Sequence, residues 1–229
     1  LALQNGDLDM TWAYSTGVSG SYQDVLAATD TLTLEAVTAA NAPAVLAFNN
    51  ANGPFADENL RLAVSYALDY DSFRTVFGSA YASNPNRGFV PPVTVGYKET
   101  EALGQDLTKA AQCMADAGYT EKNADGFYVN ADGETCAFTL TCNAGKEAHV
   151  GYAELVKTQL EQFGIQVVLE TLDADSYNAK TSNKFSENNI TMEAAIYGYT
   201  AAGMGMKNGL ATIYVDGTHP VQGGCQVFD

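Results

Sequence analysis

A strand, a helix and a second strand follow one another between residues 135 and 172, and this pattern most constrains the fold. Residues 135–141 have apolar side chains at alternate positions, as one face of a strand does. Residues 147–163 repeat apolar side chains at three- and four-residue steps, and Gly164 follows as a helix end. Residues 165–172 are again strand-like. Such a unit predicts parallel strands joined by a crossover helix.

Further helices are predicted before this unit. Residues 57–67 repeat apolar side chains at helical steps, and Asp57 is a candidate N-cap. Asp71 is expected to cap a short second helix that Gly78 ends. Residues 106–117 have an apolar stripe and predict a third helix.

Further strands and turns complete the expected fold. Residues 127–129 predict a short strand between two copies of the turn sequence Asn-Ala-Asp-Gly, at residues 123–126 and 130–133. Residues 192–199 predict one more buried strand, which a glycine-rich stretch at residues 203–209 follows. Together these elements predict an α/β fold with mixed sheets.

The charge of the chain excludes one class of partner. It has 27 acidic and 11 basic residues among 229, a formal net charge of −16. This charge repels phosphate backbones, so we expect no nucleic-acid partner. No run of 18 or more apolar residues is present, so we expect no membrane span.

The cysteines show no metal-binding or redox spacing. No two of them form a Cys-x-x-Cys pair, which argues against a zinc ribbon or a thioredoxin-type motif. Two readings stay open: small buried hydrophobic side chains, or a disulfide from Cys113 to Cys136 or Cys142. The fourth cysteine is Cys225.

Catalytic and cofactor motifs are absent from the sequence. His149 and His219 belong to no metal-ligand motif, and residues 17–21 (GVSGS) miss the nucleophile-elbow pattern by one position. The glycines of residues 203–209 do not match a dinucleotide fingerprint. We therefore predict no enzyme, no metal and no cofactor, and an α/β enzyme remains the alternative class.

Tyrosine is abundant, with 13 residues in the chain. Tyr197 and Tyr199 flank Gly198 at the end of the predicted strand. Tyrosine combines a large apolar ring with a polar tip, which suits a binding face for a mid-sized organic ligand. Packing of the same rings in a core is the alternative.

One long stretch carries a family resemblance. Residues 51–73 (ANGPFADENLRLAVSYALDYDSF) resemble the signature stretch of the family 5 extracellular solute-binding proteins, the dipeptide and oligopeptide receptors of ABC importers. Four other stretches resemble family elements in the same order: residues 3–10, 45–50 (VLAFNN), 89–97 (FVPPVTVGY) and 109–120 (KAAQCMADAGYT).

The resemblance implies a mixed-sheet lobe of a type II periplasmic-binding-protein-like fold. Residues 1–44 would link from a second lobe, and residues 45–229 would form the large ligand-binding lobe. The other lobe, with a signal peptide and any lipid anchor, would precede Leu1, and a return segment would follow Asp229.

The resemblance also implies a transport function rather than catalysis. The protein would be a monomeric substrate-binding component of an ABC importer, in the extracellular space or the periplasm. The full-length chain would be a cell-surface lipoprotein. It would capture a peptide-like solute by lobe closure and deliver it to the permease subunits.

Ligand contacts follow from the resemblance only where motifs match. The loop after the first strand of the βαβ unit and the residues around the end of the strand at 192–199 face the cleft in similar proteins. The ligand-binding residues implied in this way are Asn143, His149, Tyr177, Tyr197, Tyr199 and Thr200.

The sequence departs from the peptide receptors at one point. Those receptors carry Trp and then Asp after this strand, and the Asp binds the free amine of the peptide. Here Tyr199 and Ala202 follow, with no acid before Asp216. Because a buried ammonium without a carboxylate is costly, a receptor for an oligosaccharide, a modified peptide or a nickel chelate is the alternative.

Overall fold

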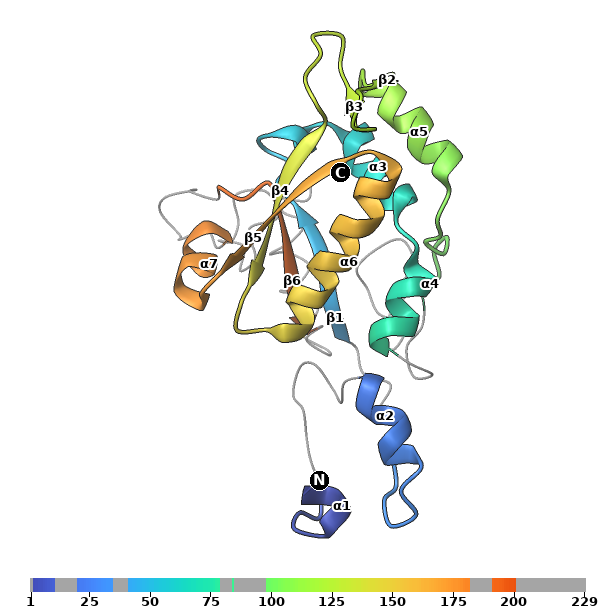
Figure 1. The fold of residues 1–229 in the computed structure, drawn as a ribbon, viewed down its shortest axis with the longest axis vertical. Coiled ribbons are helices and arrows are strands. Elements are labelled where there is room, and N and C mark those ends of the chain that lie inside the picture. The colour runs from blue at the N-terminus through green and yellow to red at the C-terminus, as the bar shows by residue number, and fades with distance from the viewer. Residues whose placement is uncertain are drawn as a thin grey trace.

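Four strands form one mixed sheet in the part of the chain that the structure describes (Figure 1). The structure is a computed structural model, and it describes residues 2–10, 20–34, 41–78, 84, 98–181 and 191–200. The strand order is β1-β6-β4-β5, with the bounds β1 Asn41–Phe48, β4 Ala137–Asn143, β5 Gln166–Leu172 and β6 Ala194–Thr200.

The strand directions confirm the predicted βαβ unit. β4 and β5 are parallel and pair from Ala137↔Gln166 to Asn143↔Leu172, with α6 (Glu147–Phe163) between them in the chain. β6 is parallel to β4, and β1 is antiparallel to β6. The sheet is therefore mixed, as the sequence predicts.

Helices cover both faces of this sheet (Figure 1). α6 lies on one face with α3 (Glu58–Ala67) and α5 (Leu107–Asp116), and α7 (Ala174–Thr181) lies on the other. Side chains alternate along a strand, so Ala194 and Ile196 of β6 pack in the core under α6, whereas Ala195 and Tyr197 pack with Tyr177 of α7.

The main core lies between the sheet and α3, α5 and α6. Phe55 packs its ring against Phe48 and Phe138, with ring centroids 4.3 and 4.8 Å apart. These rings anchor the short helix η1 (Pro54–Ala56) and the start of α3 to the sheet. Burying this many apolar side chains is the main source of stability of the fold.

The predicted cap at Asp57 is confirmed, and Asp106 caps a second helix, α5. Asp57 accepts a 2.7 Å hydrogen bond from the N–H of Asn59, and Asp106 accepts one of 3.0 Å from the N–H of Lys109. The prediction that Asp71 caps the short helix is wrong. Asp69 caps α4 (Tyr70–Phe73), because its carboxylate reaches the N–H groups of Asp71 and Ser72.

The strand boundaries also differ from the predictions by one or two residues. β4 begins at Ala137 rather than at Thr135, because the N–H of Cys136 donates to the carbonyl of Tyr128 in the preceding hairpin. This hairpin consists of β2 (Glu121–Lys122) and β3 (Tyr128–Val129), joined by the first Asn-Ala-Asp-Gly turn. β6 is shifted two residues later than its predicted start.

The cysteines of the described residues are free thiols. Cys136 and Cys142 are buried under the helices, and Cys113 is half-buried. The prediction that Cys136 and Cys142 are small buried hydrophobic side chains is therefore confirmed. The alternative, a disulfide from Cys113 to either of them, is wrong. Cys225 lies outside the described residues.

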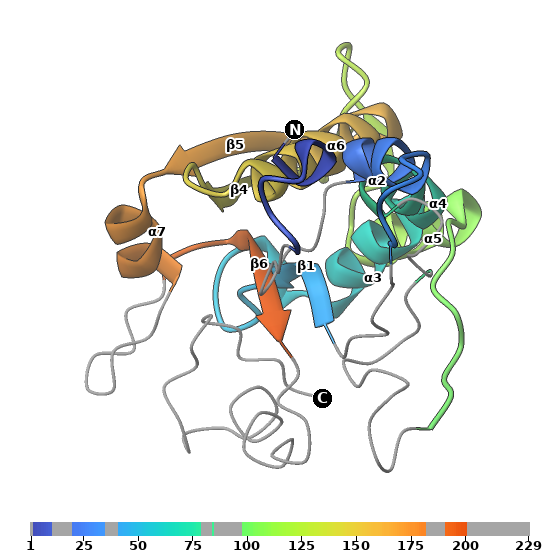
Figure 2. The same cartoon turned by 90° about the horizontal axis from the view of Figure 1, so that it is seen from below.

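Two short helices near the N-terminus stand apart from the sheet. α1 (Ala2–Asn5) and α2 (Gly20–Ala27) lie at the lower end of the view in Figure 1, and Figure 2 shows α2 beside α4. α2 contacts η2 (Arg74–Gly78), the π-helical segment that continues α4. β1 spans the predicted boundary between residues 44 and 45, so the sheet begins at Asn41.

Several predicted features lie outside the described residues. They are the glycine-rich stretch at residues 203–209, the loop at residues 89–97, Asp216 and His219.

Candidate functional site

The three parallel strands end at one edge of the sheet. β4 ends at Asn143, β5 at Leu172 and β6 at Thr200, and parallel strands present their carboxyl ends on the same side. We call these strand ends, with residues 143–149 and the start of α7, the carboxyl edge. It lies on the lower side of the sheet in Figure 1.

The chain continues from β4 and from β5 toward opposite faces of the sheet. The loop after β4 leads into α6 on one face of the sheet, and β5 leads into α7 on the other. Open α/β sheets bind ligands outside the carboxyl ends of strands whose connections diverge in this way. The carboxyl edge is therefore the candidate binding site.

β6 separates from β4 as it approaches the edge. The two strands pair only at Leu140↔Ala194 and Thr141↔Ala195, whereas β1 continues beside β6 up to Asn41↔Thr200. The backbone of Tyr199 and Thr200 is thus held by β1 and extends beyond the paired part of β4. Tyr199 and Thr200 therefore lie at the carboxyl edge.

The loop after β4 is held by its own hydrogen bonds. The side-chain oxygen of Asn143 accepts a 2.8 Å hydrogen bond from the N–H of Gly145, and the N–H of Ala144 donates to the carbonyl of Leu172. Asn143 is 8% exposed. His149, in the first turn of α6, is 2% exposed. The structure therefore places both predicted residues at the edge with most of their surface buried.

Tyr177 and Tyr197 lie in contact with each other, with ring centroids 5.8 Å apart. The Tyr177 hydroxyl donates to the carbonyl of Ile196 at 2.7 Å, and the Tyr197 hydroxyl donates to the carbonyl of Thr181 at 2.9 Å. The structure thus brings this pair together next to the end of β6.

A polar group beside this pair was missed by the sequence analysis. Glu170 of β5 accepts a 2.9 Å hydrogen bond from the hydroxyl of Thr141 and forms an ion pair with Lys180 of α7. Burial raises the pKa of Glu170, but the hydrogen bonds from Lys180 and Thr141 and the charge of Lys180 outweigh it, so the pKa is lowered. The available signal was a polar side chain inside each of two mostly apolar strands, Thr141 in β4 and Glu170 in β5.

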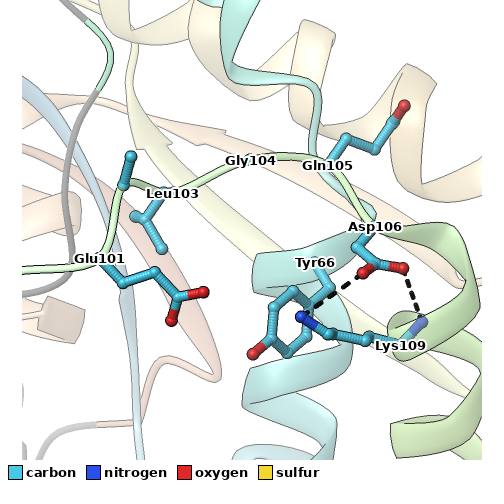
Figure 3. A pocket seen from close by; sticks show the side chains of 8 residues that line it. Tyr66, Glu101, Leu103, Gly104, Gln105, Asp106 and Lys109 are labelled. Carbon is cyan, nitrogen blue, oxygen red and sulfur yellow. Dashed lines mark hydrogen bonds and ion pairs between the residues drawn. The ribbon is translucent and has the colours of Figure 1, made fainter.

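A shallow hollow of about 180 Å³ lies elsewhere, between α3 and the start of α5 (Figure 3). Lys109 lies 5.3 Å from the ring centroid of Tyr66 and 3.6 Å from the Asp106 carboxylate. The opposite charges of Lys109 and Asp106 neutralise each other. None of the residues that line this hollow belongs to the carboxyl edge, which remains the candidate site.

Within the described residues, no helix has both the length and the apolar character needed to cross a membrane.

The sequence matches one family and its relatives. The family model of the bacterial extracellular solute-binding proteins, family 5 middle, matches residues 1–218. The oligopeptide-binding protein AppA of Bacillus subtilis is 27% identical over 133 residues, which are 56% of this chain and 24% of AppA. The match thus spans about a quarter of the length of this curated relative.

Solved structures share the fold. NikA from Brucella suis in complex with Fe(III)-EDTA has a TM-score of 0.75 at 20% identity, over 86% of this chain and 38% of NikA. AppA from Bacillus subtilis in complex with a nonapeptide has a TM-score of 0.66 at 22% identity, over 87% of this chain and 38% of AppA. Since the family model covers nearly the whole chain and the fold agrees with it, this chain belongs to the bacterial extracellular solute-binding proteins of family 5.

Proposed function

We propose that this chain forms the ligand-gripping lobe of the substrate-binding component of an ABC importer. It captures a peptide-like solute outside the membrane by lobe closure and delivers it to the permease subunits. The observation that carries the proposal is the carboxyl edge, where β4 and β6 separate and the residues around Asn143 and Thr200 lie at neighbouring strand ends.

The residues of the carboxyl edge suit recognition of a neutral polar solute. Asn143 supplies an amide, His149 an imidazole, and Tyr199 and Thr200 hydroxyl groups. Such groups pair with the N–H and carbonyl groups of a peptide backbone, and tyrosine adds apolar area. Tyr177 and Tyr197 lie beside these residues, and their hydroxyls bind backbone carbonyls of β6 and α7.

The relatives support two classes of solute. One solved relative holds a nonapeptide and another holds Fe(III)-EDTA. In this chain no acidic residue follows Thr200 before Asp216, so none stands directly after β6 for a peptide amine. This feature favours the second candidate, a receptor for an oligosaccharide, a modified peptide or a nickel chelate.

The wider organisation is proposed on the same family membership. Residues 1–44 would link to a second lobe, and residues 45–229 would form the large lobe. The protein would work as a monomer, anchored as a cell-surface lipoprotein, without chemical conversion of its solute.

Calorimetric titration tests the proposal. Nonapeptides with free and acetylated amines, an oligosaccharide, Ni(L-His)₂ and Fe(III)-EDTA serve as probes, and mass spectrometry follows each probe. We expect saturable binding of one class and no conversion. Absence of binding to all of them, or conversion of a bound probe, would overturn the proposal.

A matched pair of variants locates the binding. Asn143→Ala should weaken binding at least tenfold. Asn123→Ala is the control. The side-chain oxygen of Asn123 accepts similar hydrogen bonds, from the N–H groups of Asp125 and Phe127 in the hairpin of β2 and β3. Its loss should leave the affinity unchanged. Equal losses of affinity in both variants would argue against the carboxyl edge.

A further inference from the structure

Two tyrosines connect α7 and β6 in a reciprocal way. The hydroxyl of Tyr177, on α7, donates to a backbone carbonyl of β6, that of Ile196. The hydroxyl of Tyr197, on β6, donates to a backbone carbonyl of α7, that of Thr181. The two rings meet edge to face, at an interplanar angle of 64°. Each element is thus bound through the side chain of the other.

Little apolar burial holds α7 in place. Of its eight residues only Tyr177 and Thr181 are buried, and the Thr181 hydroxyl donates to the carbonyl of Tyr177. Elements with few buried apolar contacts move at low free-energy cost. The position of α7 therefore depends on its hydrogen bonds to a larger extent than that of α6, which packs along the core.

The bond from Tyr177 reaches β6 just past the point where β6 stops pairing with β4, while β1 still pairs with β6 on its other side. Register pairing with β4 stops at Ala195, and the next residue, Ile196, receives the Tyr177 hydroxyl. Tyr199 and Thr200 follow within four residues. A shift of Ile196 would therefore shift the strand end at which we propose that the solute binds.

We propose that Tyr177 and Tyr197 are positioning residues, which fix the end of β6 at the carboxyl edge and do not themselves contact the solute. Their hydroxyls are occupied by backbone carbonyls. The inference rests on the proposed function for its effect on affinity. Its structural part, the fixing of β6, needs no ligand.

Phenylalanine variants test it, because they remove each hydroxyl and keep the ring. Tyr177→Phe and Tyr197→Phe are compared with Tyr70→Phe, which loses the same kind of bond, to the carbonyl of Ser65 at 3.0 Å, and belongs neither to the carboxyl edge nor to β6 or α7. Without ligand, amide hydrogen exchange of residues 194–200 should be about fivefold faster in the first two variants and unchanged in Tyr70→Phe.

Affinity is the second measurement, with a nonapeptide and Fe(III)-EDTA as probes. Tyr177→Phe and Tyr197→Phe should each lower the affinity for the probe that the wild type binds by about fivefold. Tyr70→Phe should bind that probe as tightly as the wild type does. Unchanged exchange, or equally faster exchange in Tyr70→Phe, overturns the inference. So does a loss of affinity with unchanged exchange, which would show direct contact. If the wild type binds neither probe, the proposed function is in question, and the exchange result still decides whether the tyrosines fix β6.

Discussion

The hydroxyl of Thr141 donates a 2.9 Å hydrogen bond to the carboxylate of Glu170, its register partner on the adjacent parallel strand. Lys180 of α7 forms an ion pair with the same carboxylate oxygen. Glu170 therefore joins β4, β5 and α7 at the face of the sheet that α7 covers. This group lies beside the tyrosine pair and supports the same helix.

Glu170→Gln should lower the free energy of unfolding by about 1 kcal/mol near neutral pH, because a partly exposed ion pair and one hydrogen bond are weakened. The pKa of Glu170 is lowered from its ordinary value of 4.5. Its stabilisation is therefore complete above pH 4.5 and is lost as the pH falls through the lower folded value.

Urea unfolding of both proteins as a function of pH measures this effect. The difference between wild type and Glu170→Gln should shrink as the pH falls below 4.5. Glu154→Gln, at an exposed position of α6, should unfold as the wild type does at neutral pH. A constant difference at all pH values would contradict the role of the ionised carboxylate.

The cap of α4 gives a second prediction. Asp69→Ala should lower the free energy of unfolding by about 1 kcal/mol, because the N–H groups of Asp71 and Ser72 lose their acceptor. Asp71→Ala, two residues later, should have a smaller effect, since the Asp71 carboxylate contacts only exposed side chains. Chemical denaturation compares the two, and a larger loss for Asp71→Ala would show that the cap is misassigned.

Gly164 gives a third prediction. Its φ is +118°, and an added Cβ would lie 2.9 Å from the carbonyl oxygen of Gly126. Gly164→Ala should therefore lower the free energy of unfolding by about 1–3 kcal/mol. Gly104→Ala is the control, because a Cβ there meets no atom within 4 Å. In thermal unfolding, the stability of Gly104→Ala should stay close to that of the wild type. Equal losses of stability in Gly164→Ala and Gly104→Ala would contradict the explanation.

The buried thiols give a fourth prediction. Burial raises the pKa of the Cys136 thiol to about 12, and Cys142 is fully buried. Since the thiolate is the reactive form, neither should react with iodoacetamide in the native protein, and both should react in urea. Peptide mass spectrometry measures the modification. Rapid native labelling of either thiol, or a disulfide between either one and Cys113, would contradict the structure.

Local patterns predicted the helices and strands of this fold well. The bounds of α6 match the predicted residues 147–163, because the apolar repeat and Gly164 define a helix within one stretch of sequence. The error at α4 is also local. Asp69 and Asp71 have the same side chain two positions apart, and only the backbone geometry distinguishes the cap from a residue inside the helix.

Long-range pairing could not be predicted from such patterns. β6 lies between β1 and β4 in the sheet, and its pairing with β1 joins segments that are more than 100 residues apart in the chain. Thr141 and Glu170 are 29 residues apart. The site residues came from the family resemblance. That resemblance placed them near the strand ends, and only the structure shows that the hydroxyls of Tyr177 and Tyr197 bind backbone carbonyls.

The most direct test of the central claim is to map where a solute binds. Amide hydrogen exchange is measured with and without the probe that gives saturable binding in the titrations. Binding at the carboxyl edge predicts slower exchange at residues 143–149 and 194–200, with no change around the hollow at residues 101–109. Protection at residues 101–109 with none at the strand ends would contradict the account.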